Sequence, residues 1–285
     1  MMFKKETQVY YSPDSQLKNP KQLMKNMLMD LGASQELAYR LFIRNISAQY
    51  RKTYLGYVWA FLPPILTTAI FVFLNKNKIF EIESTPIPYP IFVLAGSILW
   101  QLFYDSLQSP IRLVNTSREM LAKINFPREA LILAGIYEVL FNFLIRFSLF
   151  LAAMFYFKLP LSLGIFWVPF GIAAIVILGI TLGLFLTPLS VLYQDAEQGI
   201  PLVMSLWFFM TPVVYPLPQT GAPSLLAKIN PISPLLTTTR EWMTGMAVSQ
   251  IHVFGAVALI FLCIFISAWF FYRLALPHII ARIGS

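Results

Sequence analysis

Residues 165–186 have the sequence IFWVPFGIAAIVILGITLGLFL, which is predominantly apolar and carries no charge. An α-helix that crosses a bilayer needs about 20 such residues, so this stretch predicts a membrane-spanning helix. Five other apolar stretches bring the expected number of spans to six, at about residues 57–74, 88–107, 130–157, 200–214 and 253–274. The stretch at 200–214 is short for a crossing, and we expect it to be broken or partly re-entrant.

The composition agrees with an all-α integral membrane protein. Of the 285 residues, 58% are hydrophobic and 12% are charged, whereas a soluble domain carries about 25% charged residues. Cys263 is the only cysteine, which excludes an intrachain disulfide and a thiolate metal site. His252 and His278 lack nearby cysteine or carboxylate companions, so we expect no metal, no cofactor and no catalytic residue in this chain.

The basic residues are distributed unevenly between the loops. With six spans, 15 of the 21 Lys and Arg residues fall on the side that holds both termini, and five fall on the other side. Basic loops stay in the cytoplasm, so we expect a multi-pass inner-membrane protein with both termini cytoplasmic. The net charge of +8 is then explained without nucleic acid as a partner. Residues 1–20 are polar, so no cleavable signal peptide is expected.

The region before the first span divides into two parts. We expect residues 1–34 to be a cytoplasmic tail and residues 35–285 to be a single transmembrane domain, which opens with an amphipathic helix at 35–54. Helical spacing gathers apolar side chains on one face and Arg40, Arg44 and Arg51 on another. Such a helix suits the headgroup layer of a membrane, although a solvated helix packed on the protein has the same pattern.

Two loops are also informative. Residues 218–248 mix prolines, which prevent long helices, with apolar side chains, so we expect short external helices that re-enter the outer leaflet. Residues 110–128 form a cytoplasmic loop whose mixed charged and apolar residues suit a short helix docked on a partner; an ordinary solvated loop is the alternative. The candidate docking residues are Arg118, Glu119, Met120, Leu121, Lys123 and Ile124.

Polar residues recur within the third span. Glu138, Asn142 and Arg146 are spaced four residues apart, so they follow one helical face. A charge at this depth costs roughly 3 kcal/mol or more, so these side chains must face a cavity, a water path or a partner helix. Glu138 and Arg146 are about 12 Å apart along the axis and cannot pair with each other. The strip is either part of a substrate path or a contact that joins helices.

Three motifs, in this order, resemble a known family. They are QYRKTYLGYVWAFLP at 49–63, KINFPRE at 123–129, and a later set made of YQD at 193–195, FMTPVVYP at 209–216 and NP at 230–231. They are similar to motifs in the membrane subunits of type 2 ABC exporters for O-antigen, capsule and teichoic-acid polysaccharides, and the match extends over about residues 35–272. The family often has Arg-Asp where this chain has Gln194-Asp195, so a role for that arginine does not transfer.

The resemblance implies a complex of two copies of this chain with two copies of a separate ABC ATPase. It also implies a long glycan on an undecaprenyl diphosphate lipid as substrate. Residues 35–50 would form a gate helix, Leu55-Gly56 a turn into the first span, and 118–124 the helix that docks on the ATPase. A P-loop requires a Gly-Lys pair, and this chain has none, so ATP and magnesium are expected on the partner.

Aromatic residues are abundant, and flat rings can carry a sliding sugar polymer without holding it tightly. Trp and Tyr also gather at membrane interfaces for other reasons, so this pattern has two explanations. The aromatic candidates for the path are Tyr57, Trp59, Trp207, Phe208, Phe209, Tyr215 and Trp242, whereas Tyr50 belongs with the expected gate helix.

Other functions remain open at this point. An ABC subunit for teichoic acid, for a drug or for another amphiphile would have a similar pattern. A membrane glycosyltransferase is disfavoured, because such chemistry requires paired acids or a metal cluster. An ion-coupled transporter is disfavoured because we find no internal repeat.

Overall fold

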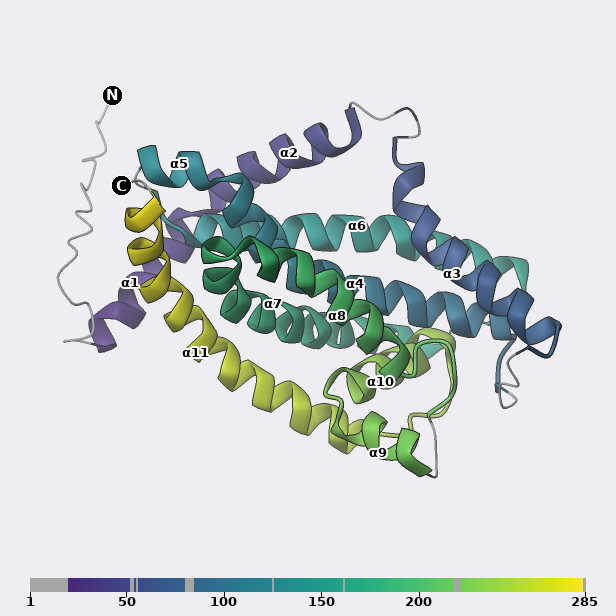
Figure 1. The fold of residues 1–285 in the computed structure, drawn as a ribbon. Helices are drawn as coiled ribbons and strands as arrows, with labels where there is room; N and C mark the ends of the chain where they lie inside the picture. The colour runs from purple at the N-terminus through teal and green to yellow at the C-terminus, as the bar shows by residue number, and fades with distance from the viewer. Residues whose placement is uncertain are drawn as a thin grey trace.

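The computed structural model describes residues 20–51, 54, 56–79, 85–124, 126–160, 162–217 and 221–283. Within these ranges the chain is all helical and contains no strand, as the sequence predicts (Figure 1). The helices are α1 (Pro20–Ala33), α2 (Gln35–Arg51), α3 (Val58–Lys76), α4 (Tyr89–Thr116), α5 (Arg118–Lys123), α6 (Glu129–Tyr156), the 3-10 helix η2 (Leu163–Trp167), α7 (Val168–Leu192), α8 (Gln194–Met210), α9 (Gly221–Ile229), α10 (Ile232–Thr244) and α11 (Ile251–Ile283).

Five segments of the described chain are long and apolar enough to cross a membrane. They are α3, α4, α6, the continuous segment Leu163–Leu192 and the part Ile251–Leu276 of α11. The expected second span begins where predicted, but α4 continues as a helix through Pro110 to Thr116, so the loop expected at 110–128 is partly helical. Five of the six expected spans therefore have a long helix in the expected place.

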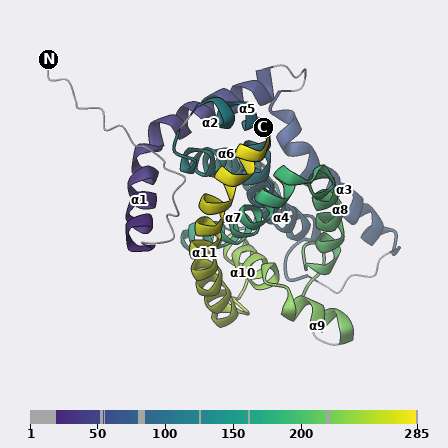
Figure 2. The ribbon, with the colours of Figure 1, turned by 60° about the vertical axis from the view of Figure 1, so that its left-hand side comes forward.

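The central helix of the bundle is α4, most of which is buried, with α3, α6 and α7 packed around it (Figure 2). Glycines permit the close approach of α7 to α4. A Cβ atom built on Gly183 would collide with the backbone oxygen of Leu107, and one on Gly179 would collide with Ser106 and the backbone of Phe103. Small residues at such contacts are typical of membrane helices, because backbones must approach closely to gain packing energy there.

The predicted fifth span corresponds to α8, which has 17 residues and is shorter than the other candidate spans. It begins at the end of the bundle where α4 finishes, since Asn115 donates a hydrogen bond of 2.8 Å to Glu197. The segment after α8 reaches the opposite end, where the Tyr89 hydroxyl donates to the Val214 carbonyl at 3.0 Å. Thus α8 together with the segment that follows it runs from one end of the bundle to the other, and its crossing of a membrane stays a prediction.

The segment between α8 and α11 is fixed to the bundle through α10. All residues of α10 are buried, including Arg240, whose guanidinium donates to the carbonyls of Pro212 and Val213 at 3.0 and 3.1 Å. The same guanidinium lies 3.7 Å from the centre of the Phe92 ring. Burial lowers the pKa of Arg240 to about 9, and two carbonyls and a ring face compensate the buried charge. The helix α10 is thus part of the packed fold, whereas Leu225, Leu226 and Ile229 of α9 are exposed; the depth of both helices in a membrane stays a prediction.

The described parts nearest to the two termini meet at one end of the bundle (Figure 1). Arg273 of α11 donates to Asp30 of α1 at 2.6 Å and also pairs with Glu129 at the start of α6. Residues 20–33 form α1 within the region expected to be a tail, while residues 1–19 lie outside the described ranges.

Candidate functional site

The amphipathic pattern of residues 35–54 produces the helix α2, which packs along α6. Its buried face consists of Ala38, Leu41, Ile46 and Tyr50, while Arg40, Arg44 and Arg51 are exposed. The arginine face is therefore free to meet a charged surface, as the pattern predicts. Leu55 lies outside the described residues. Gly56 has a φ of +50°, a backbone conformation that favours glycine, and it connects α2 to α3.

A buried carboxylate joins three helices beside α2. Glu138 of α6 is 1% exposed. It accepts hydrogen bonds of 2.7 Å from Asn45 of α2 and from Arg112 of α4, through its two different oxygens. Arg44 in turn donates to Asn45 at 3.1 Å. A buried carboxylate is tolerated when both oxygens are paired in this way.

The next two residues of the predicted strip have separate partners. Asn142 accepts a 2.9 Å hydrogen bond from the Tyr50 hydroxyl, and burial raises the pKa of Tyr50, which keeps its proton. Arg146 pairs with Asp105 of α4 at 2.5 Å and donates to the Ala60 carbonyl of α3 at 3.2 Å. We name Glu138, Asn142 and Arg146 with these partners the α6 polar strip. It links α2, α3 and α4 to a single helix.

The sequence analysis missed the partners of the strip. Asp105 and Arg112 are seven residues apart on α4, which places them two turns apart on one face. That spacing could have indicated a polar face on α4 opposite the strip. It was not recognised because α4 was expected to end near residue 107, before Arg112. Asn45 lies on α2 among surface residues and carries no charge, so nothing in the sequence separated it from them.

The predicted docking segment is a short helix, α5, at the end of α4. Arg118 donates to the side chain of Asn115 at 2.8 Å and to the Ser190 carbonyl at 3.4 Å, which fixes α5 to the ends of α4 and α7. Lys123 and Ile124 are exposed. An open cavity of about 750 Å³ lies beside this corner and is lined by Asn115, Thr116, Arg118, Glu119, Met120, Lys123 and Ile124. The corner thus offers an exposed, mixed charged and apolar surface.

Part of the predicted aromatic set lines a groove between α3, α4 and α8. The groove has a volume of about 330 Å³, and its predicted members are Phe208 and Phe209. It also contains aromatic residues that the sequence analysis missed, namely Phe71, Trp100 and Tyr104. The Trp100 and Phe208 rings meet edge to face with centroids 5.6 Å apart. An aromatic wall with polar side chains beside it, from Thr67, Gln101 and Ser205, is suited to contact a sugar face.

The other predicted path residues lie elsewhere. Tyr57 and Trp59 are exposed at the start of α3, and Tyr57 packs on Tyr50 with ring centroids 4.4 Å apart. Tyr215 donates to the Phe209 carbonyl at 2.8 Å. Trp242 is buried against Trp167 and Phe254 rather than at the groove. The structure therefore brings only part of the predicted set together.

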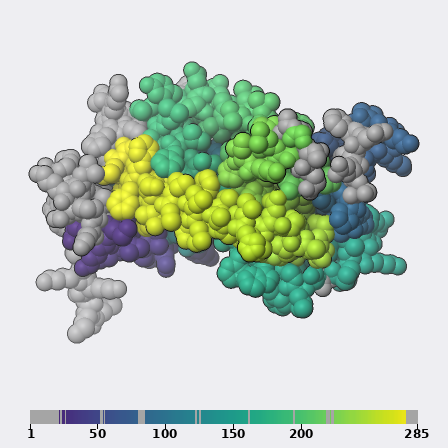
Figure 3. All heavy atoms as spheres, turned by 90° about the horizontal axis from the view of Figure 1, so that it is seen from below, coloured from purple at the N-terminus to yellow at the C-terminus, as the bar shows by residue number. Residues whose placement is uncertain are grey.

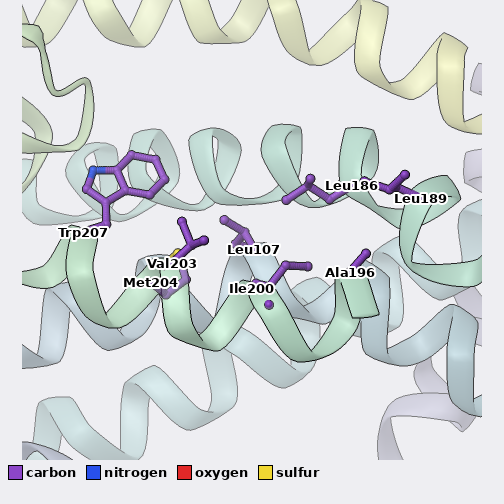
Figure 4. Close-up of a pocket in the computed structure, with 9 residues that line it drawn as sticks. Leu107, Leu186, Leu189, Ala196, Ile200, Val203, Met204 and Trp207 are labelled. Carbon is purple, nitrogen blue, oxygen red and sulfur yellow. The ribbon is translucent and has the colours of Figure 1, made fainter. Parts of the chain in front are cut away.

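Trp207 faces a second, apolar cavity of about 230 Å³ between α4, α7 and α8 (Figure 4). Its other lining residues are aliphatic or small: Leu107, Leu186, Leu189, Ala196, Gly199, Ile200, Val203 and Met204. No polar side chain is positioned there for chemistry. Among the described residues there is also no group of His, Cys, Asp or Glu side chains that could hold a metal ion.

Comparison with known proteins identifies the class. The family model described as "ABC-2 type transporter" matches residues 36–242, from α2 to the end of α10. The chain belongs to this family. As an ABC-2 permease it is a multi-pass transport subunit without an ATPase domain, which confirms the resemblance found in its motifs. The family match spans all the helices that carry the α6 polar strip, the α5 corner and the aromatic groove.

Similar curated proteins carry a more specific name. The chain is 30% identical over 224 residues to the "O-antigen export system permease protein RfbA" of Myxococcus xanthus, an alignment that covers 75% of this chain and 83% of that protein. It is 24% identical over 226 residues to a protein of the same name from Klebsiella pneumoniae, covering 77% and 85%. This ABC-2 permease is therefore a distant homologue of permeases named for O-antigen export.

Proposed function

We propose that this ABC-2 permease is the transmembrane subunit of an ATP-driven exporter that moves an undecaprenyl-diphosphate-linked, O-antigen-like polysaccharide across the cytoplasmic membrane. The observation that carries the proposal is the similarity to O-antigen export permeases over about three quarters of the chain. The aromatic groove between α3, α4 and α8 supports a sugar substrate, because ring faces bind flat apolar faces without demanding one geometry.

Two copies of the chain would form the conduit, with both termini in the cytoplasm and α8 as the sixth span. The direction of α8 along the bundle supports an even number of crossings. The external helices α9 and α10 would then close the outer end and re-enter the outer leaflet. In this arrangement the grooves of the two copies contribute to one glycan path.

Two copies of a separate ATPase, which binds ATP and magnesium, would dock at the α5 corner. The exposed Lys123 and Ile124 and the open cavity beside them support this assignment. Arg118 also ties α5 to α4 and α7, so a push on α5 would reach the long helices. A short amphipathic helix in a partner groove is a common recognition mode.

The α2 helix would act as the gate at the cytoplasmic entrance. It is held to α6 by Asn45 and Tyr50 through the α6 polar strip. Arg44 and Arg112 both lie next to this strip, and the Arg112 side chain is 46% exposed. Two guanidinium groups at the edge of the conduit suit a lipid diphosphate, which is the charged part of the proposed substrate. The strip would thus be both a contact between helices and the border of the path.

The test uses cells that lack the chain and retain its ATPase and glycan synthesis. Expression of the chain should restore surface polysaccharide, and an ATPase variant that cannot hydrolyse ATP should abolish that restoration. Export of a drug or of teichoic acid without the glycan would favour the other ABC functions. Glycan export that persists with the inactive ATPase would contradict the proposal.

A further inference from the structure

The helix α1 occupies a defined position at one end of the bundle. Asp30 is bonded to Arg273, whose side chain is 5% exposed and which also pairs with the buried Glu129. Met27 is 1% exposed and packs on the same side. These contacts fix the C-terminal half of α1 against the ends of α6 and α11.

The position of Arg273 sets the depth of α1 relative to a bilayer. With a rise of 1.5 Å per residue, Arg273 lies about 33 Å along α11 from Ile251, which is close to the hydrocarbon thickness of about 30 Å. Glu129 is also the first residue of the α6 candidate span. The Asp30–Arg273–Glu129 cluster therefore lies at the same end of two candidate spans, where the expected border between hydrocarbon and headgroups falls.

The exposed face of α1 carries apolar side chains at this depth. Met24, Leu28 and Met29 are 44%, 60% and 55% exposed. Exposed Lys25 lies among them on the helix. The space-filling view shows α1 beside the C-terminal part of α11 (Figure 3), whose candidate membrane span is mostly exposed. An apolar edge with a lysine beside it, next to a lipid-facing helix, has the character of a surface helix.

From the position of α1 at the ends of two candidate spans and from its exposed apolar side chains, we infer that α1 is a second membrane-surface helix, which inserts Leu28 and Met24 among lipids of the inner leaflet and places Lys25 at anionic headgroups. It lies outside the region matched by the ABC-2 family model, which begins at residue 36. The inference depends on the depth of α11 and not on the identity of the exported substrate. A protein partner, either the ATPase or a second copy, is the competing occupant of this surface.

The experiment measures the depth of single residues in the full complex. Cys263 is the only cysteine and is exposed, so Cys263→Ser provides a background for labelling. Leu28→Cys and the exposed control Gln22→Cys, about 120° away around the helix, receive an environment-sensitive fluorophore. The complex is placed in vesicles of phosphatidylcholine and phosphatidylglycerol that contain lipids spin-labelled near the headgroup. We expect the label at residue 28 to be quenched at least twofold more strongly than the label at residue 22.

Three results distinguish the occupants. Stronger quenching at 28 than at 22, with and without the ATPase, supports the inference. Equal quenching at the two positions overturns it. A label at 28 that lipids do not quench, and that is shielded by the ATPase or by a second copy, also overturns it and assigns the surface to protein. Lys25→Glu should reduce quenching at residue 28 in these anionic vesicles and leave it unchanged in pure phosphatidylcholine.

Discussion

Arg112 donates a 2.7 Å hydrogen bond to Glu138, and in this way α4, which leads directly into α5, is joined to the carboxylate that also binds the gate helix α2. The Arg112 side chain is half-exposed while Glu138 is 1% exposed. Because the buried carboxylate has one partner on each of two helices, a shift of either helix changes its hydrogen bonds.

Glu138→Gln should reduce glycan export about tenfold while ATPase binding and hydrolysis are retained. The amide still accepts from Asn45 but loses the charge that attracts Arg112, so motion of α4 would reach α2 less effectively. Export and ATP hydrolysis are measured on the same complex. The matched control is Glu36→Gln, which breaks the exposed Glu36–Arg40 pair on α2 and should leave export unchanged. Equal loss of export and ATP hydrolysis in Glu138→Gln would indicate a purely structural role.

Arg146→Ala should lower the thermal stability of the purified protein. The change leaves Asp105, whose side chain is only 19% exposed, without its cation. Removal of one partner of a buried ion pair costs about 3 kcal/mol or more. Thermal unfolding in detergent measures the change. Arg40→Ala, which removes an exposed pair, should have little effect. Asp105→Asn combined with Arg146→Met should recover part of the lost stability; a double variant no better than Arg146→Ala would count against the pair.

Gly183→Ala should destabilise the bundle, because the new Cβ would meet the Leu107 carbonyl and the Pro110 ring. Overpacking of this kind costs about 1–3 kcal/mol. Gly199→Ala is the matched control: it lies in the helix α8 with no atom close to the new Cβ, and alanine favours helix there. We expect a lower midpoint of unfolding for the first and an unchanged or higher midpoint for the second. Equal midpoints would mean that α4 and α7 are not in close contact.

Reversing the charges at the α5 corner should weaken binding of the ATPase. The variant combines Arg118→Glu with Glu119→Arg, and co-purification of the two proteins measures the effect. Because Arg118 also bonds Asn115, Lys123→Glu serves as a second variant whose side chain is exposed. Lys76→Glu, at the other end of the bundle, is the control and should leave recovery of the ATPase unchanged. Full recovery with both corner variants would argue against docking at α5.

Phe209→Ala should reduce glycan export several-fold without loss of protein, because it removes an exposed ring from the groove between α3, α4 and α8. Loss of one stacking ring weakens binding by about 1–3 kcal/mol in nucleic-acid grooves. Phe155→Ala, an 82% exposed ring outside the groove, is the control. Quantified surface glycan compares the two, and equal effects would remove the groove from the path.

The places and order of five long helices could be predicted from sequence because the bilayer requires long apolar runs, whereas the crossing by the sixth, α8, stays a prediction. The residues at which the helices end could not be predicted as well. Near residue 107 the apolar run ends but the helix does not, since α4 continues to Thr116 through a buried region that contains Pro110. Because α4 was expected to end near residue 107, Arg112 was assigned to a loop and not to this helix. In the aromatic set, Phe209 and Trp242 look equivalent in sequence, but one is exposed at a groove and the other packs on Trp167.

The sequence by itself determined the family, the helical class and the face of α6 that carries Glu138, Asn142 and Arg146, because hydrophobic periodicity and local motifs are properties of neighbouring residues. Only the tertiary structure decided what these side chains meet. Asp105 and Arg112 come from α4, Asn45 and Tyr50 from α2, and Asp30 reaches Arg273 across most of the chain. Such partners are fixed by how whole helices pack, and packing depends on contacts that no local pattern records.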